Sequence, residues 1–431
     1  MSAAAGISET LKKRKNILLQ KEAYQKIIDG NMISAFVTVF ISLLLAYALS
    51  EVLKRTLGFP RVVGQVGAGL ILGITIFESV LFNREAYEVL SFLANLGIIL
   101  LFYYIGLEIN FRAFTKNIKG SILISLFNTT IPFVIGFAVM KWIFNFPTMI
   151  SLIFGVALSV SAQSVSLGFL EELKLVKSKI GSLIISAGAV DDIIELVLVS
   201  ILLSIFRVAV SDISLPRLIV GILFFVIFIL AARLWLIPYV LKFFDREKSS
   251  TSRFTGSLLI VLFIASLSEY LGIGLLIGAM VAGMVVRQTI YRDLAIPDWE
   301  EHDIARSVHI IAFGFLIPLF YVWVGLNTEI ASIITEWLFV AVLLVIALVG
   351  TVGGSAIAVL LRGGSLREGM ILGFGLVPKG DVELAIATLA LNAGILTPIL
   401  FTSLVLMSLL TTIISPIMFK YLVLKSKKAI K

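Results

Sequence analysis

The sequence predicts an all-α polytopic membrane protein with about thirteen transmembrane helices arranged as an inverted repeat. Three features support this fold class: a scarcity of charge, a series of apolar runs, and a similarity between the two halves of the chain. Of the 431 residues, 59% are hydrophobic and 14% are charged, whereas about 25% of residues are charged in an average soluble domain. The mean hydropathy is +1.07. Because the deficit of charge extends along most of the chain, it indicates many spans.

Thirteen apolar runs are long enough to cross a bilayer. They lie at about residues 32–53, 62–82, 89–111, 120–144, 148–170, 179–206, 214–240, 254–271, 273–290, 304–325, 335–361, 368–394 and 396–424. Polar joints with turn residues separate most runs, and the shortest joint is Tyr270-Leu271-Gly272 between the eighth and ninth.

The basic residues predict the orientation of the spans. Nearly all loop lysines and arginines follow odd-numbered runs or lie in the C-terminal tail, so the positive-inside rule places these segments in the cytoplasm. Thirteen spans then place the N-terminus outside, although Leu11–Lys26, "LKKRKNILLQKEAYQK", is basic. We expect that segment to be an amphipathic helix on the surface of a cell membrane. The net charge of +8 is then a topology signal, and no nucleic-acid partner is expected.

Other residue types restrict the chemistry further. The chain has no cysteine, which excludes disulfides and thiolate metal sites. His302 and His309 lie where a polar loop ends and an apolar run begins, and we expect both to be interfacial. The composition suggests neither an enzyme nor a bound cofactor.

A repeat relates the two halves of the chain. Leu101–Ile109, "LFYYIGLEI", in the third run resembles Leu319–Ile330, "LFYVWVGLNTEI", in the tenth, with an offset of 218 residues. Gly69 and Gly283, in the second and ninth runs, are 214 residues apart. An offset of seven spans inverts the second copy in the membrane, and inverted repeats are typical of secondary transporters. The predicted organisation is a polar segment at 1–31, a transmembrane domain at 32–424 with repeats at about 32–206 and 254–424 and a linker helix at 214–240, and a basic tail at 425–431.

Two runs are expected to be broken helices. The twelfth contains Pro378, which lacks an N–H, flanked by glycines and followed by Lys379, Asp381 and Glu383 near its centre. A break exposes free backbone groups that can face an ion in a transporter.

The fifth run contains the position that the repeat pairs with this break. Subtracting 218 from Asp381 gives Gln163, which lies between Ser161 and Ser164 in "LSVSAQSVSLG". Serines in membrane helices usually serve close packing, but the repeat favours a second broken helix here.

Three acids occupy the middle of the sixth run. Asp191, Asp192 and Glu195 lie in "SAGAVDDIIELVLVS", and the repeat pairs the two aspartates with Leu409 and Leu410. The carboxylates therefore belong to one half only. Burial and neighbouring charges shift a carboxyl pKa towards neutrality in general, so one carboxylate can bind either a proton or a hard cation. This competition is the minimum that a cation/proton exchanger requires, and the alternative is a structural salt-bridge network around Lys379.

Five stretches resemble motifs of the monovalent cation:proton antiporters of the prokaryotic sodium–proton and potassium–proton group. They are "FPRVVGQVGAGLILG" (Phe59–Gly73), "LGIILLFYYIGLEI" (Leu96–Ile109), "AGAVDD" (Ala187–Asp192), "PLFYVWVGLNTEI" (Pro318–Ile330) and "PKGDVELAIA" (Pro378–Ala387). The resemblance covers about residues 32–424.

The resemblance implies a homodimer in membrane lipid, with a scaffold domain and a mobile core in which the fifth and twelfth runs cross at their breaks. It implies exchange of Na⁺ or Li⁺, with K⁺ as the alternative cation, for H⁺ by movement of that core. Asp192 then carries the cation and the proton, and Asp191 is the second acid found in electrogenic members. Lys379, Asp381, Glu195, Glu383, Ser161, Gln163 and Ser164 are expected to support the site.

The chain departs from the family pattern at several positions. Ala162-Gln163 replaces a threonine–serine pair, and Lys379-Gly380-Asp381 replaces Arg-Gly-Glu. Electrogenic relatives have a lysine in the eleventh run, where this chain has Thr351. Either Lys379 replaces that lysine as the partner of Asp191, or Asp191 stays protonated.

Three other functions compete with sodium/proton exchange. A potassium/proton exchanger often has Gln-Asp in place of Asp-Asp and a nucleotide-binding domain, neither of which is found in this sequence. A sodium-coupled organic-anion symporter on a similar fold needs a roomier, less acidic site. A channel is the third alternative.

Overall fold

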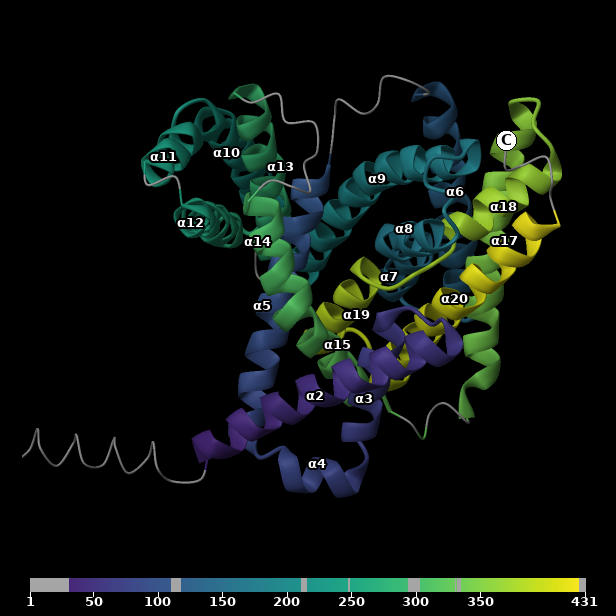
Figure 1. The fold of residues 1–431 in the computed structure, drawn as a ribbon, viewed down its shortest axis with the longest axis horizontal. Coiled ribbons are helices and arrows are strands. Elements are labelled where there is room, and N and C mark those ends of the chain that lie inside the picture. The colour runs from purple at the N-terminus through teal and green to yellow at the C-terminus, as the bar shows by residue number, and fades with distance from the viewer. Residues whose placement is uncertain are drawn as a thin grey trace, which may run out of the picture.

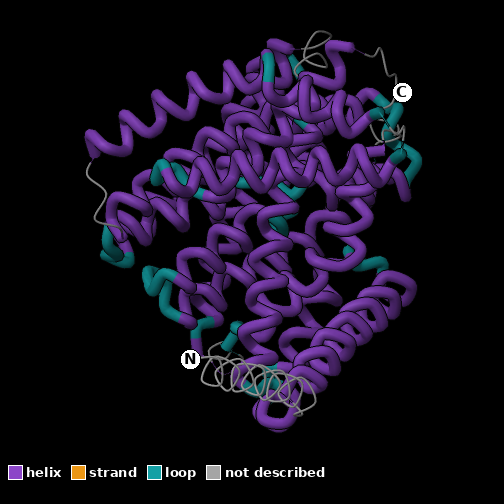
Figure 2. The backbone as a smooth tube through the Cα atoms, turned by 90° about the vertical axis from the view of Figure 1, so that its left-hand side faces the viewer, coloured by secondary structure: helices purple, strands orange, loops and turns teal. Residues whose placement is uncertain are grey.

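The computed structural model describes residues 31–109, 118–210, 215–246, 249–293, 303–329, 331 and 335–425. These residues form helices and turns, with no strand among them (Figure 2). The all-α prediction is therefore confirmed for the described part of the chain. The basic stretch Leu11–Lys26, His302 and the tail beyond residue 425 lie outside it.

The helices pack as two bundles. Bundle I contains α2 (Asn31–Leu57), α3 (Arg61–Leu72), α4 (Thr75–Leu81), α5 (Arg84–Glu108), α10 (Leu215–Leu234), α11 (Leu236–Asp245), α12 (Ser250–Tyr270), α13 (Leu275–Asp293), α14 (Asp303–Ile311), the π-helical turn η4 (Ala312–Leu316) and α15 (Ile317–Leu326). Bundle II contains α6 (Ile118–Ala138), the π-helical turn η2 (Val139–Ile143), α7 (Thr148–Ser159), α8 (Gln163–Glu172), α9 (Lys179–Val210), α17 (Trp337–Leu361), α18 (Leu366–Leu376), α19 (Val382–Asn392) and α20 (Pro398–Leu424).

Packing defines this division. Among the described helices, the closely packed pairs lie within one bundle, apart from α3 against α20. In Figure 1, α10–α14 lie to the left and α6–α9, α17, α18 and α20 to the right. The chain passes from bundle I to bundle II and back, so each bundle combines segments from both halves of the sequence.

Each predicted apolar run falls on one helix or on consecutive helical segments, but four runs are interrupted in ways that were not expected, one of them the run at 120–144, which contains the turn η2. The run at 62–82 divides into α3 and α4 at Gly73, where a Cβ would lie 3.2 Å from the Leu326 carbonyl oxygen. The run at 214–240 bends by 44° between α10 and α11. The run at 304–325 contains the turn η4.

Helix length and apolarity define the spans that the structure supports. Eight described helices are long and apolar enough to cross a membrane, or nine if the bent pair α10–α11 counts as one span. The helix α9, with its three acids, is not one of the eight. Thirteen spans therefore remain a prediction, whereas a multi-span helical fold is confirmed.

The two expected breaks are present, and they meet. Residues 160–162 separate α7 from α8, and residues 377–381 separate α18 from α19. The Ala162 N–H donates to the Pro378 carbonyl oxygen at 2.7 Å, and a Cβ on Gly380 would lie 3.5 Å from the Ala162 side chain. The crossing therefore satisfies part of the backbone that each break leaves free.

Four glycines pack in two reciprocal pairs in bundle I. A Cβ on Gly69 would lie 2.8 Å from the Gly325 Cα, and one on Gly283 would lie 2.9 Å from the Gly106 carbonyl carbon. The predicted repeat relates Gly69 to Gly283 and the region of Gly106 to that of Gly325, so it exchanges one pair for the other. A two-fold relation between the halves requires such an exchange, and this packing supports the predicted inverted repeat.

The shortest joint in the chain depends on glycine conformation. α12 ends at Tyr270, and Gly272 and Gly274 have φ of +80° and +122° before α13 begins at Leu275. The Glu269 carboxylate accepts from the Leu275 N–H at 2.9 Å. The turn is therefore tight because glycines take up the left-handed backbone and a side chain satisfies a free helix N–H.

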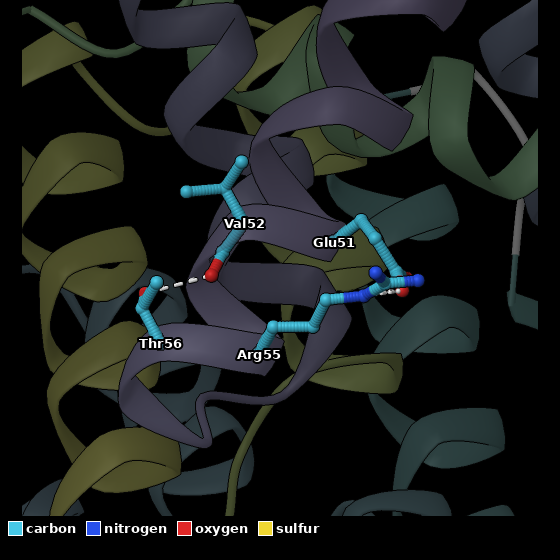
Figure 3. A network of polar contacts seen from close by, with 4 residues as sticks. All are labelled: Glu51, Val52, Arg55 and Thr56. Carbon is cyan, nitrogen blue, oxygen red and sulfur yellow. Dashed lines mark hydrogen bonds and ion pairs between the residues drawn. The ribbon is translucent and has the colours of Figure 1, made fainter.

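The end of α2 carries polar contacts at its exposed surface (Figure 3). The Arg55 guanidinium pairs with the Glu51 carboxylate at 2.6 Å, and the Thr56 hydroxyl donates to the Val52 carbonyl at 2.7 Å. Glu51 and Arg55 are one helical turn apart, so this is a local surface pair.

Candidate functional site

Asp191 is held inside bundle II by three side chains of α6. It lies on α9 with 1% of its surface exposed, and its carboxylate accepts from Ser125 at 3.0 Å, from Asn128 at 3.0 Å and from Thr129. These three donors occupy one face of α6 because they are three and four residues apart. A buried carboxylate needs such donors to offset the loss of water.

Asp192 faces a different way. Successive residues on a helix point about 100° apart, and Asp192 lines a cavity of about 520 Å³ between the two bundles, where it is half-buried. The cavity wall includes residues of α5, α13, α14 and η4 of bundle I and of α8, α9 and both helix breaks of bundle II. Exposed side chains on the bundle I side of this cavity are Glu108, Arg306 and His309.

Glu195 joins the cavity to the first break. Its side chain is buried, lines the cavity, and accepts the Ser161 N–H at 2.5 Å. Ser161 lies in the break, where its N–H has no α-helical partner. Glu195 therefore has a defined structural role in addition to any role in transport.

Asp381 lies where the two broken helices cross. Its carboxylate accepts from the Ser164 hydroxyl at 2.9 Å and from the Tyr321 hydroxyl at 2.5 Å. It immediately precedes α19, while Ser164 is in the first turn of α8. The carboxylate is therefore close to the N-terminal ends of two helices, where negative charge is stabilised.

Lys379 and Glu383 are buried beside the crossing. The Lys379 ammonium group is fully buried and has no hydrogen-bond partner among the described residues. It interacts electrostatically with Glu195, Glu383 and Asp191, but forms no ion pair within 4.0 Å in the described part of the chain. The Glu383 carboxylate accepts from Ser408 at 3.0 Å through one oxygen, and its second oxygen has no hydrogen-bond partner in the part of the chain that the structure describes.

Thr351 occupies the position where a lysine was expected from the family pattern. It is buried in α17, and its hydroxyl has no hydrogen-bond partner among the described residues. One turn further along α17, the Ser355 hydroxyl donates to the side-chain Oδ1 of Asn128 at 3.4 Å. Position 351 is thus one turn from Ser355, which contacts Asn128, a donor to Asp191. Thr351 itself is uncharged and supplies no counter-charge to Asp191.

The predicted residues therefore divide between three places. Asp192, Glu195, Ser161, Gln163, Ser164 and Asp381 all line the cavity. Asp191 faces α6, and Lys379 and Glu383 lie in the packed interior. No group of three Asp, Glu, His or Cys side chains among the described residues is arranged to chelate a metal ion. Binding of a monovalent cation by Asp191 and Asp192 stays a prediction.

Sequence reasoning did not select the residues that hold these acids. Ser125, Asn128 and Thr129 bind Asp191, Tyr321 binds Asp381, and Ser408 binds Glu383. The "NTT" triplet in the fourth apolar run is a polar cluster at mid-membrane depth, and it could have indicated a partner for the aspartates. Tyr321 gave no such signal because it lies in a motif that is otherwise apolar.

Known proteins resemble the chain over nearly all of its length. The family described as "Sodium/hydrogen exchanger, transmembrane" matches residues 39–425. A Na⁺/H⁺ antiporter of Enterococcus hirae is 27% identical over 88% of this chain and 95% of its own length. The Na⁺/H⁺-K⁺ antiporter GerN of Bacillus cereus is 30% identical over 86% of this chain and 92% of its own length.

A solved structure shares the fold. The sodium proton antiporter MjNhaP1 of Methanocaldococcus jannaschii superposes with a TM-score of 0.62, covering 92% of this chain and 99% of that protein at 14% identity. This likeness concerns the fold alone, while the family match and the relatives concern the sequence. The chain belongs to the sodium/hydrogen exchanger family of multi-span membrane antiporters, and it is a cation/proton transporter and not an enzyme.

Proposed function

We propose that this chain exchanges Na⁺ or Li⁺ for protons by alternating access, with Asp192 as the carboxylate that the two ions share. The observation that carries the proposal is the different surroundings of the two adjacent aspartates. Asp192 is open to the cavity, whereas Asp191 accepts three hydrogen bonds from α6. Of the two carboxylates, only that of Asp192 is free to exchange a proton for a cation.

The cavity supplies the remaining requirements of an exchange site. Ser161, Gln163, Ser164 and Asp381 place hydroxyl, amide and carboxylate oxygens around the same space as Asp192, and such oxygens suit hard monovalent cations. A proton on Asp192 removes its charge and so weakens cation binding. This competition couples the two ions without a second binding site.

The arrangement of the bundles supports the alternating-access part of the proposal. The cavity lies between bundles I and II, and each bundle is internally packed. Bundle II, which carries the aspartates and both broken helices, is proposed as the moving core, and bundle I as the scaffold. The cavity wall at Glu108, Arg306 and His309 adjoins loops that the charge distribution assigns to the cytoplasm.

Several further properties are proposed from the sequence and the family. They are residence in the cell membrane, a cytoplasmic C-terminus with the N-terminus outside, and a homodimer embedded in lipid. Potassium is the second candidate cation, because the relative from Bacillus cereus is named as a Na⁺/H⁺-K⁺ antiporter.

Transport in proteoliposomes tests the proposal. A pH-sensitive dye reports proton movement when Na⁺, Li⁺ or K⁺ is added in turn, and we expect a response to Na⁺ and Li⁺. Asp192→Asn keeps the size of the side chain but removes the shared carboxylate, so exchange should fall to the level of empty liposomes. Ser204→Ala, which removes a local hydroxyl bond to the Ser200 carbonyl on the same helix, is the matched control.

Two results would contradict the proposal. Cation-dependent proton movement that persists in Asp192→Asn rules out this carboxylate as the carrier. Absence of a response to every cation in the unmodified protein rules out the exchange itself. A response to K⁺ alone would favour the second candidate cation.

A further inference from the structure

Two hydrogen bonds connect bundle I to bundle II at the α15 segment. The Tyr321 hydroxyl of α15 donates to the Asp381 carboxylate at 2.5 Å. The Glu329 N–H, which follows α15, donates to the Thr402 hydroxyl of α20 at 2.9 Å. In both cases the donor belongs to bundle I and the acceptor to bundle II.

The order of residues along α14, η4 and α15 places these bonds relative to the cavity. Arg306, His309 and Phe313 line the cavity from the first part of this segment. Tyr321 follows His309 by twelve residues, which is about 18 Å along a helix, and Glu329 lies further on. The cavity is therefore open beside the first part of the segment, and the two bundles are bonded together beside its last part.

Asp381 lies both on the cavity wall and at the hydrogen-bonded connection between bundles I and II. Its carboxylate lines the cavity and binds Ser164 of its own bundle as well as Tyr321 of the other. Movement of bundle II along α15 preserves the bond to Ser164, because both partners move together. The same movement separates Asp381 from Tyr321.

The glycine contacts favour relative movement at this boundary over movement within a bundle. At Gly106, Gly283, Gly350 and Gly354, a Cβ would come within 3 Å of backbone on a neighbouring helix of the same bundle. Such close backbone packing resists sliding. Side-chain bonds such as that of Tyr321 can break and reform with much smaller rearrangement.

We propose that Tyr321 is a state-determining positioning residue: its hydrogen bond to Asp381 stabilises the conformation in which the cavity opens beside Glu108, Arg306 and His309. The inference rests on the alternating access proposed above, but it assigns a role to a hydroxyl that neither binds the cation nor carries the proton. A hydrogen bond made in only one of two conformations biases their ratio by its full free energy.

Cysteine labelling measures that ratio directly, because the chain has no native cysteine. Ile185 lines the cavity from α9 and is exposed, so Ile185→Cys provides a single reactive thiol in bundle II. A membrane-impermeant maleimide is applied to either side of sealed vesicles. The ratio compared between variants is the labelling rate from the side where the cavity opens beside Glu108, Arg306 and His309, divided by the labelling rate from the opposite side.

Tyr321→Phe in this background should lower the ratio by about tenfold, since a hydrogen bond to a charged acceptor usually contributes at least that factor. Asp381→Asn retains an acceptor oxygen, so its ratio should fall between those of the parent and Tyr321→Phe. Tyr87→Phe is the matched control: the Tyr87 hydroxyl also bonds to the α15 region, at 2.8 Å from Asn327, but within bundle I. Its ratio should match the parent.

Two outcomes would overturn the inference: a ratio for Tyr321→Phe within twofold of the parent, or an equal change in Tyr87→Phe. The labelling assay requires no ion exchange, so its result is separate from the proteoliposome test. A shifted ratio without cation-dependent proton movement would contradict the proposed function and leave the role of Tyr321 supported. Cation-dependent proton movement with an unchanged ratio would support the proposed function and contradict the role of Tyr321.

Discussion

At the scale of single residues, the two adjacent aspartates differ because of their neighbours and not because of their own chemistry. Asp191 meets three donors on α6, while Asp192 meets a cavity. One of the two alternatives for the missing lysine was a direct partnership between Lys379 and Asp191, and these side chains form no ion pair among the described residues. Neutral donors from α6 satisfy the Asp191 carboxylate instead.

Removing one of these donors should destabilise the protein. Asn128→Leu keeps the branched shape of the side chain but leaves one Asp191 oxygen without its amide donor, which should reduce the free energy of unfolding by about 2 kcal/mol. The melting temperature of the purified protein measures the effect. Asn95→Leu is the control, because among the described residues the Asn95 amide bonds only to the Ser91 carbonyl one turn away on α5. Equal melting temperatures for the two variants would contradict this account of Asp191.

At the scale of secondary-structure elements, the protein combines close contacts between helices with two broken helices. The breaks at residues 160–162 and 377–381 cross and share a backbone hydrogen bond. The hydroxyl of Thr412 donates to the Lys379 carbonyl, and that of Ser415 to the Phe374 carbonyl. Polar side chains of α20 thus bond backbone carbonyls at and near the second break.

Helix pairs that meet at glycine should not tolerate even one additional carbon atom. In Gly106→Ala, the new Cβ would lie 2.1 Å from the Met280 carbonyl oxygen, so α5 and α13 would have to separate and the melting temperature should fall. Gly353→Ala is the control, because no atom of the described residues lies within 4 Å of a Cβ there, and alanine favours a helix over glycine by about 1 kcal/mol. A melting temperature for Gly106→Ala at or above that of Gly353→Ala would refute the close packing.

At the scale of the whole molecule, the functional question is whether bundle II moves relative to bundle I. The two bundles share the cavity that contains Asp192 and are joined near α15 and between α3 and α20. If transport requires their relative movement, a covalent link between them must stop it. A link within one bundle should have no such effect.

Cross-linking tests this movement. Glu329→Cys with Thr402→Cys places one thiol in each bundle at positions now joined by a hydrogen bond, and a short thiol-reactive cross-linker should abolish exchange until it is reduced. Tyr87→Cys with Asn327→Cys, a pair that is in contact within bundle I, should form the link without losing exchange. Undiminished exchange in a fully cross-linked Glu329/Thr402 pair would exclude movement at this boundary.

Much of this architecture could be predicted from the sequence because a membrane imposes strong constraints on composition. Apolar runs of sufficient length, a proline with a lysine and an aspartate at mid-span, and a repeated pattern specify helices, a break and a second break 218 residues earlier. The carboxylates of the sixth run could also be selected, because charge inside a membrane is costly and usually functional.

The tertiary structure decided how these residues are used. Only the packing shows that Asp191 lies against α6 and Asp192 on the cavity. It also shows that Lys379 is buried and that Tyr321 bonds to Asp381. Hydropathy reports the environment of a segment averaged over many residues, so it cannot distinguish two neighbours that point about 100° apart. The sequence by itself determined which helices and which acids exist; the structure determined which of those acids is open to an ion, because hydrogen bonds between distant segments satisfy one carboxylate and leave the other facing a cavity.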